Sequence, residues 1–403
     1  MTTVAIVTEY NPFHSGHKYQ IDCIREYFGN DTRIIAVMSG NFTQRGEVAI
    51  LDKGERAKNA VDNGVNLVLE LPFPYSISSA ELFAGAAISI IDRLGTVDYL
   101  AFGSEDGNTE KLIEYARNCS STIYLEKLNE LIKSEGSEGY PSLCERAYTL
   151  TFGEGAPRVS MTPNNILAIE YIKALLHRGS KIKPVAFVRK GAAYNAEIDE
   201  INQHQSATGI RCALFAKDYS ALDYVPKSTK ESILHSKENG SFPASNSALS
   251  TAIISSIRLN APSTVTDIHD VGGGLYNRLF AAAQEATDLG TLISLTETKK
   301  YTTARIRRAV WYSFLGVTSS DVKESPEYTQ VLGMDEVGRS ILKEIGKQST
   351  LPIVTKPSRT PELNSVGKRQ FSNSQRADSV FELCKPSPGK GDASLRFSPY
   401  VKK

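Results

Sequence analysis

The sequence predicts an α/β fold, with a parallel β-sheet that carries a helical insertion and a mainly helical region after it. In the first hundred residues, short β-branched runs alternate with segments of helical periodicity, which is typical of βαβ units and a parallel sheet. From about Asn108 to Gly179 the apolar residues recur with helical spacing, and no convincing strand separates them. Beyond about Ser220 the segments are loop-like or helical.

Each element of the sheet region follows from a short apolar run or from a helical pattern. Strands are predicted at residues 4–7, 33–39, 66–72 and 98–103, with helices at residues 16–28, 53–64 and 79–94 between them. Ligands of open parallel sheets bind at the carboxyl ends of the strands. The loops after Val7, Ser39, Pro72 and Phe102 are therefore expected to converge on one crevice.

The rest of the chain is predicted to contain the insertion, one further strand and a second group of helices. Helical patterns occupy residues 110–116, 124–132 and 164–176, a strand is predicted at residues 183–190, and Ser206 or Thr208 is placed to cap a following helix. Later helical patterns occupy residues 276–286, 303–316 and 335–345. We place a domain boundary near Leu222, between a catalytic domain of residues 1–221, with its insertion at about 108–179, and a C-terminal region of residues 222–403.

Composition excludes several classes of protein. The hydrophobic fraction of 41% and the charged fraction of 23% are ordinary for a globular protein, and no apolar stretch approaches the roughly 20 residues of a membrane span. The first ten residues lack the basic and apolar regions of a signal peptide. The five cysteines are scattered and odd in number, which favours free thiols in a reducing compartment. A cytoplasmic protein without a membrane partner is expected.

Charge is distributed unevenly along the chain. Between Lys347 and Lys403, eleven Lys or Arg stand against four Asp or Glu, which gives this segment a charge of +7 and leaves −6 for residues 1–346. A basic end on an otherwise acidic protein suits a polyanion such as RNA. The alternative is a solvated, partly disordered tail.

Two histidines, His14 and His17, flank Gly16 in the first turn between strand and helix. The helix N-terminus there aims backbone N–H groups at the crevice, which forms an anion site. Imidazoles at this place can donate hydrogen bonds to an α-phosphate during in-line attack. The glycine lets a flat ligand approach the backbone. The spacing does not fit the HExxH metal pattern and no third ligand is evident, so no protein-held metal is predicted. A pair of ordinary surface histidines is the alternative.

The stretch "NPFHSGH" (residues 11–17) resembles the HxGH signature of the nucleotidyltransferases related to class I aminoacyl-tRNA synthetases. The resemblance implies a Rossmann-like sheet. "QSATGIR" (residues 205–211) is similar to their second signature, which implies that Arg211, Ser206 and Thr208 grip the β- and γ-phosphates and the leaving pyrophosphate. Gly209 replaces the helix former expected there and weakens the helix start by up to roughly 1 kcal/mol.

Further stretches extend the resemblance over nearly the whole chain. They include "AVMSGNFTQRGEVAILDK", "NLVLELP", "FGSE", "PNNILAIEYIKAL", "VRKGAAYN", "GGLYNRL" and "KKYTTARIRRAV", and together they resemble the bacterial tRNA(Met) cytidine acetate ligase family. This implies an enzyme that activates acetate with ATP, as acetyl-adenylate. The acetyl group then passes to the wobble cytidine of elongator tRNA(Met), which becomes N4-acetylcytidine.

The resemblance also implies roles for individual residues. His14, His17 and Arg211 are the implied catalytic residues, with Mg²⁺ accompanying ATP, and Gly103, Asn164 and Arg189 are implied nucleotide contacts. The implied ATP-binding stretch comprises Val7, Thr8, Glu9, Tyr10, Asn11, Pro12, Phe13, His14, Ser15, Gly16, His17, Lys18, Tyr19 and Gln20.

Several assignments have alternatives. Gly103 is equally plausible as a turn glycine, Asn164 as a helix cap, and Asn165 competes with Asn164 for the nucleotide. Gln44 and Arg45, after the second strand, are candidates for holding the acetate carboxylate or ordering a lid, or belong to an ordinary turn.

Arg305, Arg307 and Arg308 are candidates for holding RNA, against a solvated helix face. The runner-up function is a small-molecule adenylyl- or cytidylyltransferase. A non-catalytic RNA-binding protein is the third.

Overall fold

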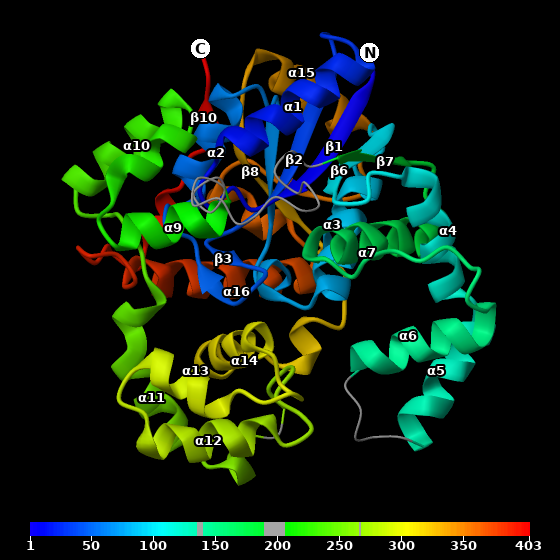
Figure 1. Ribbon diagram of the computed structural model, residues 1–403. Coiled ribbons are helices and arrows are strands. Elements are labelled where there is room, and N and C mark those ends of the chain that lie inside the picture. Colours follow the sequence, from blue (N-terminus) through cyan, green and yellow to red (C-terminus); the bar gives the residue numbers. More distant parts are fainter. Residues whose placement is uncertain (135–139, 189–205, 266) are drawn as a thin grey trace.

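The computed structural model describes residues 1–134, 140–188, 206–265 and 267–403, and its centre is a mostly parallel sheet (Figure 1). The strand order is β10-β8-β5-β2-β1-β6-β7, and β9 pairs with β8 beside this path. The strands are β1 (Thr3–Thr8), β2 (Arg33–Ser39), β5 (Leu67–Leu71), β6 (Tyr99–Ser104), β7 (Lys183–Val188), β8 (Thr329–Met334), β9 (Ile353–Val354) and β10 (Tyr400–Val401). A separate hairpin consists of β3 (Phe42–Thr43) and β4 (Glu47–Val48).

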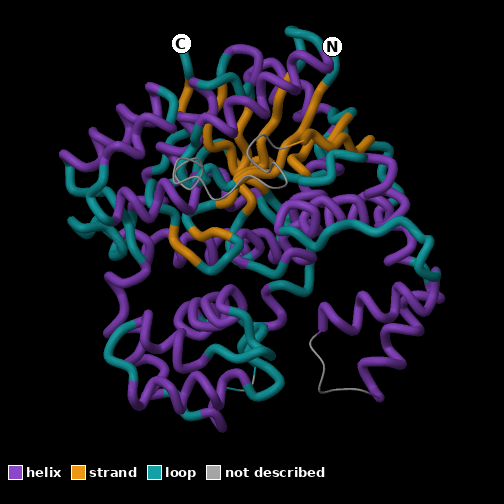
Figure 2. Tube along the Cα trace, viewed as in Figure 1, coloured by secondary structure: helices purple, strands orange, loops and turns teal. Residues whose placement is uncertain are grey.

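Helices cover both faces of the sheet, and a further group of helices lies beneath the sheet in the view of Figure 2. The helices are α1 (Ser15–Phe28), α2 (Lys53–Asp62), α3 (Ala80–Arg93), α4 (Thr109–Ser120), α5 (Thr122–Ser134), α6 (Tyr140–Phe152), α7 (Pro163–Arg178), α9 (Ala207–Phe215), α10 (Lys227–Glu238), α11 (Ser250–Leu259), α12 (Leu275–Glu285), α13 (Leu289–Thr296), α14 (Thr303–Leu315), α15 (Glu336–Gln348) and α16 (Ser365–Glu382). Short 3-10 helices are η1 (Tyr75–Ile77), η2 (Tyr219–Tyr224), η3 (Asn246–Leu249), η4 (Pro262–Thr264), η5 (Ser319–Asp321), η6 (Pro357–Glu362) and η7 (Ala393–Arg396).

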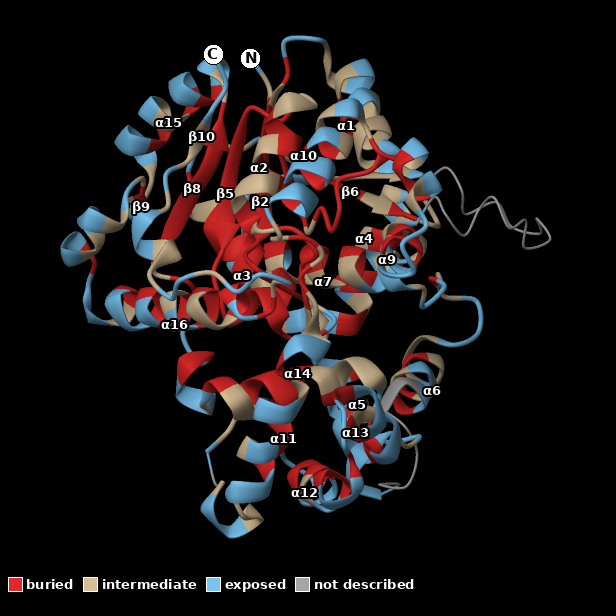
Figure 3. Cartoon of the chain, turned by 90° about the vertical axis from the view of Figure 1, so that its left-hand side faces the viewer, coloured by how far each residue is buried: buried red, intermediate tan, exposed pale blue. Residues whose placement is uncertain are grey.

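The central strands are buried on both faces because their side chains alternate between two cores (Figure 3). Ala5 and Val37 point to a core that α3, α4, α7 and α15 complete. Ile6 and Ala36 point to the opposite core, which α1 and α2 complete. This arrangement explains why the strands are continuous apolar runs in the sequence.

The sequence predictions for the sheet region are confirmed. All four predicted N-terminal strands and the strand after residue 183 are present, and β1, β2, β5 and β6 are parallel. The hairpin β3–β4 was not predicted, because each of its strands has only two residues. In the described part of the range 109–178 the structure contains helices α4 to α7 and no strand.

The region after Leu222 is mainly helical, but it also returns to the sheet. β8 pairs antiparallel with β5, and β10 pairs with β8. The prediction contained no strand here, because a six-residue buried run cannot be told from a helix segment by periodicity. The sheet thus takes strands from both sides of Leu222, and the division into two domains at this residue stays a prediction.

The basic segment from residue 347 onward is folded rather than a loose tail. It includes α16, whose Phe381 is fully buried, and α16 is anchored through a buried charge network. Lys53 Nζ lies 2.7 Å from Asp378 Oδ2 and 2.8 Å from Glu70 Oε1, so that α2, α16 and β5 meet at one ammonium group. α11 to α14 form a further core, which includes Trp311.

Two predictions about the chain as a whole can be compared with the structure. All five cysteines are free thiols, as expected. Within the described residues, no helix combines the length and the apolar character that crossing a membrane would need.

Candidate active site

A cavity of about 790 Å³ lies where the carboxyl ends of β1 and β6 meet the N-terminus of α1. The loops after β1 and β2 contribute to its lining, β6 contributes Phe102 and Gly103 near its end, and the segment after β5 contributes Ala80 and Phe83 from α3. Convergence is therefore confirmed for the segments after Val7, Ser39 and Phe102, whereas the loop after Pro72 does not reach the cavity and only the helix that follows it does. Of the predicted site residues, those lining the cavity are Val7, Thr8, Glu9, Tyr10, Asn11, His14, Ser15, Gly16, His17, Tyr19, Gln20, Gln44, Arg45, Gly103, Asn164, Ser206, Thr208 and Arg211.

The two histidines hold the start of α1 together. His14 is the N-cap residue, and its Nδ1 accepts a hydrogen bond from the backbone N–H of Gly16 at 3.0 Å. Nδ1 of His17 accepts one from the backbone N–H of His14 at 3.2 Å. A ring nitrogen that accepts carries no proton, so each neutral imidazole has its proton on Nε2. Both side chains line the cavity.

The position of the His14 ring requires a glycine at residue 16. A Cβ atom at residue 16 would lie 2.8 Å from Cε1 of His14 and 3.0 Å from its Nδ1. Real Cβ contacts are longer than this, so a side chain at residue 16 displaces the His14 ring. The glycine between the histidines thus permits the cap itself.

The second predicted signature faces the first across the cavity. Ser206 is the N-cap of α9 and its side chain accepts from the backbone N–H of Gly209 at 3.0 Å, which confirms the predicted cap. Arg211 donates from Nη1 to the carbonyl oxygen of Asn11 at 2.9 Å. This contact joins α9 to the loop after β1 across 200 residues. An arginine and a helix N-terminus together form a site suited to phosphate.

A buried arginine that the sequence analysis missed joins the ends of two strands beside the cavity. Arg56 on α2 is fully buried and donates to the carbonyl oxygens of Glu9 at 2.6 Å and of Ser39 at 3.1 Å, as well as to that of Gly40. It therefore fixes the ends of β1 and β2 relative to each other. Burial lowers the pKa of Arg56 to about 10, so it remains a cation at neutral pH. Its helical spacing with Ala60 on the apolar face of α2 was the available signal.

Glu9 connects the loop after β1 to the hairpin. Its carboxylate accepts the backbone N–H of Gln44 at 2.7 Å. Burial raises the pKa of Glu9 above its ordinary value, while that hydrogen bond and the nearby Arg211 act in the opposite direction. Gln44 in turn donates from Nε2 to the carbonyl oxygen of Ser78 at 3.1 Å. The hairpin is thereby held at the cavity rim.

The two adjacent asparagines, Asn164 and Asn165, have different surroundings in the structure. Asn165 is fully buried, and its Oδ1 accepts from Ser104 Oγ at 2.7 Å and from the backbone N–H of Glu105 at 3.1 Å. Asn164 lines the cavity, and its Nδ2 donates to the carboxylate of Glu105. Asn165 therefore fixes the end of β6, and Asn164 is the one positioned to meet a ligand.

Comparison with known proteins agrees with this geometry. Residues 1–394 match the family model described as HIGH Nucleotidyl Transferase. A protein of Thermoanaerobacter sp. (strain X514) named tRNA(Met) cytidine acetate ligase is 37% identical over 389 residues, which cover 95% of this chain and 95% of the relative. The chain belongs to the tRNA(Met) cytidine acetate ligase family.

Further members of this ligase family match over almost their whole length. The relative of that name from Halothermothrix orenii is 34% identical over 416 residues, covering 97% of this chain and 96% of its own. The crystal structure of Thermotoga maritima TmcAL bound with alpha-thio ATP superposes with a TM-score of 0.91 at 29% identity, covering 100% of both chains. The predicted family and fold class are therefore confirmed.

Some residues that the ligase family resemblance implies lie away from the cavity lining. Pro12, Phe13 and Lys18 do not line it, and Phe13 is fully buried, with its ring centroid 4.7 Å from that of Tyr10. Arg189 lies outside the described residues. Among the described residues, no three His, Cys, Asp or Glu side chains are grouped to hold a metal ion. Mg²⁺ bound with ATP takes its ligands largely from phosphate oxygens and water, so the predicted Mg²⁺ stays a prediction.

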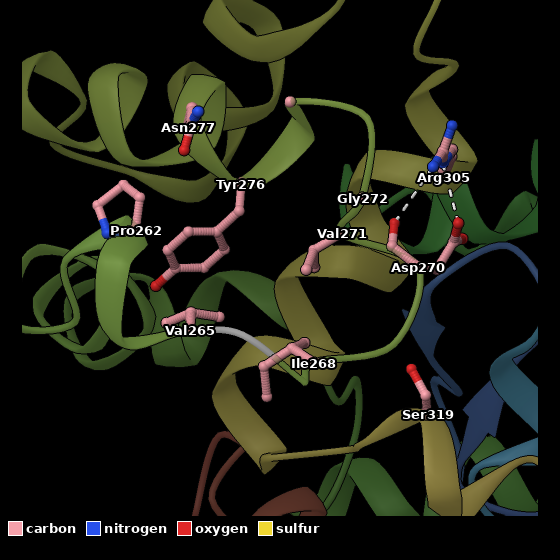
Figure 4. A pocket seen from close by; sticks show the side chains of 11 residues that line it. Pro262, Val265, Ile268, Asp270, Val271, Gly272, Tyr276, Asn277, Arg305 and Ser319 are labelled. Carbon is pink, nitrogen blue, oxygen red and sulfur yellow. Dashed lines mark hydrogen bonds and ion pairs between the residues drawn. The ribbon is translucent and has the colours of Figure 1, made fainter.

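The three arginines of α14 are engaged in ion pairs. Arg305 Nε lies 3.0 Å from Asp270 Oδ1, beside a second cavity of about 530 Å³ (Figure 4). Arg308 is only 8% exposed and pairs with the same carboxylate at 3.6 Å, so it has a structural position rather than the exposed one expected of an RNA contact. Arg307 pairs with Glu47 of the hairpin.

Proposed function

We propose that this protein is a tRNA(Met) cytidine acetate ligase, which uses ATP to attach acetate to the wobble cytidine of elongator tRNA(Met) and so forms N4-acetylcytidine. The relatives and the superposed structure bear this name or its abbreviation. The observation that carries the proposal is that one cavity unites His14, His17 and Arg211, although Arg211 lies far away in the sequence.

In the first step, acetate attacks the α-phosphate of ATP in line. The carboxylate oxygen forms a bond to phosphorus as the bond to pyrophosphate breaks. The Nε2–H groups of His14 and His17 and the N-terminus of α1 donate to the oxygens that gain charge. Arg211, Ser206 and Thr208 hold the leaving pyrophosphate. Mg²⁺ bound with ATP would neutralise part of its charge.

The rest of the cavity is proposed to hold adenosine and acetate. Gly103 and Asn164 lie at the end of β6 and the start of α7, where adenosine rests against the backbone. Arg45 supplies a cation for the acetate carboxylate, with Gln44 beside it at the rim.

In the second step, the exocyclic amine of cytidine attacks the acetyl carbonyl carbon and the C–O bond to AMP breaks. The proton lost from the amine passes to the departing phosphate or to water. Acetyl-adenylate is a mixed anhydride, so this step needs positioning and exclusion of water more than a covalent enzyme intermediate. Arg305, Arg307 and the basic segment after residue 347 are proposed to hold the RNA. These substrates place the reaction in the cytoplasm.

The test is incorporation of radiolabelled acetate into bulk bacterial tRNA with ATP and Mg²⁺, followed by mass spectrometry of the nucleosides. Wild type is expected to yield labelled N4-acetylcytidine only when ATP is present, and His17→Ala is expected to yield none. His177→Ala, an exposed histidine near the far end of α7, is the matched control and retains activity. Wild type that folds and binds tRNA without incorporating acetate contradicts the proposal and favours a small-molecule nucleotidyltransferase.

A further inference from the structure

The hairpin β3–β4 lies between the cavity and helix α14. Its turn residues Gln44 and Arg45 line the cavity. The next residue, Gly46, rests directly on α14: a Cβ atom there would lie 2.5 Å from Cβ of Arg307 and 2.7 Å from the backbone nitrogen of Arg308. The hairpin is therefore in contact with the nucleotide site on one side and with the C-terminal helices on the other.

One carboxylate of this hairpin pairs with two arginines from distant parts of the chain. Glu47 Oε2 lies 3.1 Å from Nη2 of Arg211, and Glu47 Oε1 accepts from Nη1 of Arg307. The side chains of Glu47, Arg211 and Arg307 are 22%, 15% and 33% exposed, so these pairs are screened less than surface pairs. The two arginines are 164 and 260 residues away from Glu47.

The contacts of Glu47 determine how Arg211 is presented to the cavity. The Arg211 guanidinium is held by the carbonyl oxygen of Asn11 at 2.9 Å, by Thr208 Oγ1 at 3.3 Å and by Glu47. A guanidinium has five N–H donors in a rigid plane, so three fixed contacts define the direction of the remaining donors. Glu47 is the only ionised partner among these three.

We propose that Glu47 is a positioning residue for Arg211, and that Arg307 contributes to triphosphate binding through Glu47 although it does not line the cavity. This inference rests on the proposed function, in which Arg211 binds the β- and γ-phosphates. Without Glu47, Arg211 loses its orientation and faces the like charge of Arg307. Without Arg307, the whole charge of Glu47 acts on Arg211 and competes with phosphate. Helix α14 is thus part of the nucleotide site as well as of the proposed RNA surface.

The test uses steps that need no tRNA. The variants are Glu47→Gln, Arg307→Gln and their combination, measured for ATP and AMP affinity by calorimetry and for acetate-dependent ATP–pyrophosphate exchange. Each single variant is expected to lower the preference for ATP over AMP by about tenfold, the size typical of coupled neighbours, and to slow exchange similarly. The double variant is expected to be no worse than the worse single variant, because both changes act on Arg211.

A matched control removes an arginine of similar exposure elsewhere. Arg178 pairs with Asp92 at 3.2 Å at side-chain exposures of 28% and 27%, and Arg178→Gln is expected to leave both readouts unchanged. Arg307→Lys, which keeps the charge, is expected to retain most of the ATP preference. If Glu47→Gln does not fold, the comparison of Arg307→Gln with Arg307→Lys still shows whether the charge of residue 307 affects ATP binding.

Two results would overturn the inference. One is an Arg307→Gln variant that keeps its ATP preference and exchange rate and loses only tRNA acetylation, since Arg307 then contacts RNA alone. The other is a double variant whose losses multiply. Failure of the proposed function gives a different result: wild type then prefers ATP over AMP but shows no acetate-dependent exchange, and the affinity ratios of the variants still decide the role of Glu47.

Discussion

The two ends of the nucleotide cavity are built in different ways. At the end that carries the first signature, His14 and His17 are held by backbone groups within three residues of them. At the end that carries the second, Arg211 is held by Thr208, three residues away, and by Asn11 and Glu47, which lie 200 and 164 residues away. A local motif therefore sets the geometry at the proposed α-phosphate end, whereas the proposed pyrophosphate end depends more on the assembled fold. Substitutions at the first end should change the chemistry directly, and substitutions at the second should act through the hairpin.

The largest effect is expected from His14→Ala. Loss of the Nε2–H donor should slow acetate-dependent pyrophosphate exchange by about 10²- to 10³-fold, with ATP affinity changed much less. His14→Asn separates the chemistry from the helix cap, because Asn is an excellent N-cap and supplies no imidazole. The His14→Asn variant should have the unfolding temperature of the wild type, but its pyrophosphate exchange should be as slow as that of His14→Ala. If the His14→Asn variant exchanges pyrophosphate at the wild-type rate, His14 acts only as the helix cap.

Gly16→Ala should cost about tenfold to a hundredfold in exchange rate, because the new Cβ displaces the His14 ring by a few tenths of an ångström or more. The measurement is exchange at saturating ATP. Gly85→Ala is the control: it lies within α3 with no atom in the way of a Cβ, and it should leave activity unchanged. Equal effects of the two substitutions would show that helix propensity, not the ring contact, is responsible.

Gly46→Ala tests the end of the cavity that carries the second signature, because Gly46 belongs to the hairpin that holds Arg211 through Glu47. The residue has φ +78° and meets the α14 backbone, so we expect a loss of about 1 to 3 kcal/mol in the free energy of unfolding and a several-fold drop in ATP affinity. Gly153 has the same φ of +78° with nothing near its Cβ position, so Gly153→Ala measures the backbone cost alone. Denaturant titration of both variants separates the two contributions. If Gly46→Ala and Gly153→Ala lose the same free energy of unfolding, the clash of the new Cβ atom with α14 contributes nothing to the loss.

The smallest effect is expected from Ser206→Ala, which removes the cap of α9 and should cost about 1 kcal/mol of unfolding free energy. Ser206→Asn and Ser206→Asp both restore a cap, but only Asp adds a negative charge beside the proposed phosphate site. Calorimetry should therefore find weaker ATP binding for Asp than for Asn. Equal ATP affinities of the two variants would mean that the phosphates do not bind near the N-terminus of α9.

The same contrast explains what the sequence could predict. The strand–turn–helix at His14 and the cap at Ser206 are local patterns, and both are confirmed. The burial of Arg56 had a signal in its helical spacing, but its partners and those of Glu47 could not be predicted, because they become neighbours only when the sheet, the hairpin and α14 come together. Strand β8 escaped prediction for a related reason: its pairing with β5 is a tertiary choice that its six residues do not encode.

The buried ammonium of Lys53 has a consequence for how the protein is made. Its partner Asp378 follows 325 residues later in the chain. At about 5–20 residues per second, a ribosome needs roughly a quarter of a minute to a minute to synthesise that interval. For most of this time the nascent chain carries Lys53 and Glu70 without Asp378, and the edge of β5 without β8. The completed sheet is therefore an event at the end of translation, since its edge strand β10 consists of Tyr400 and Val401.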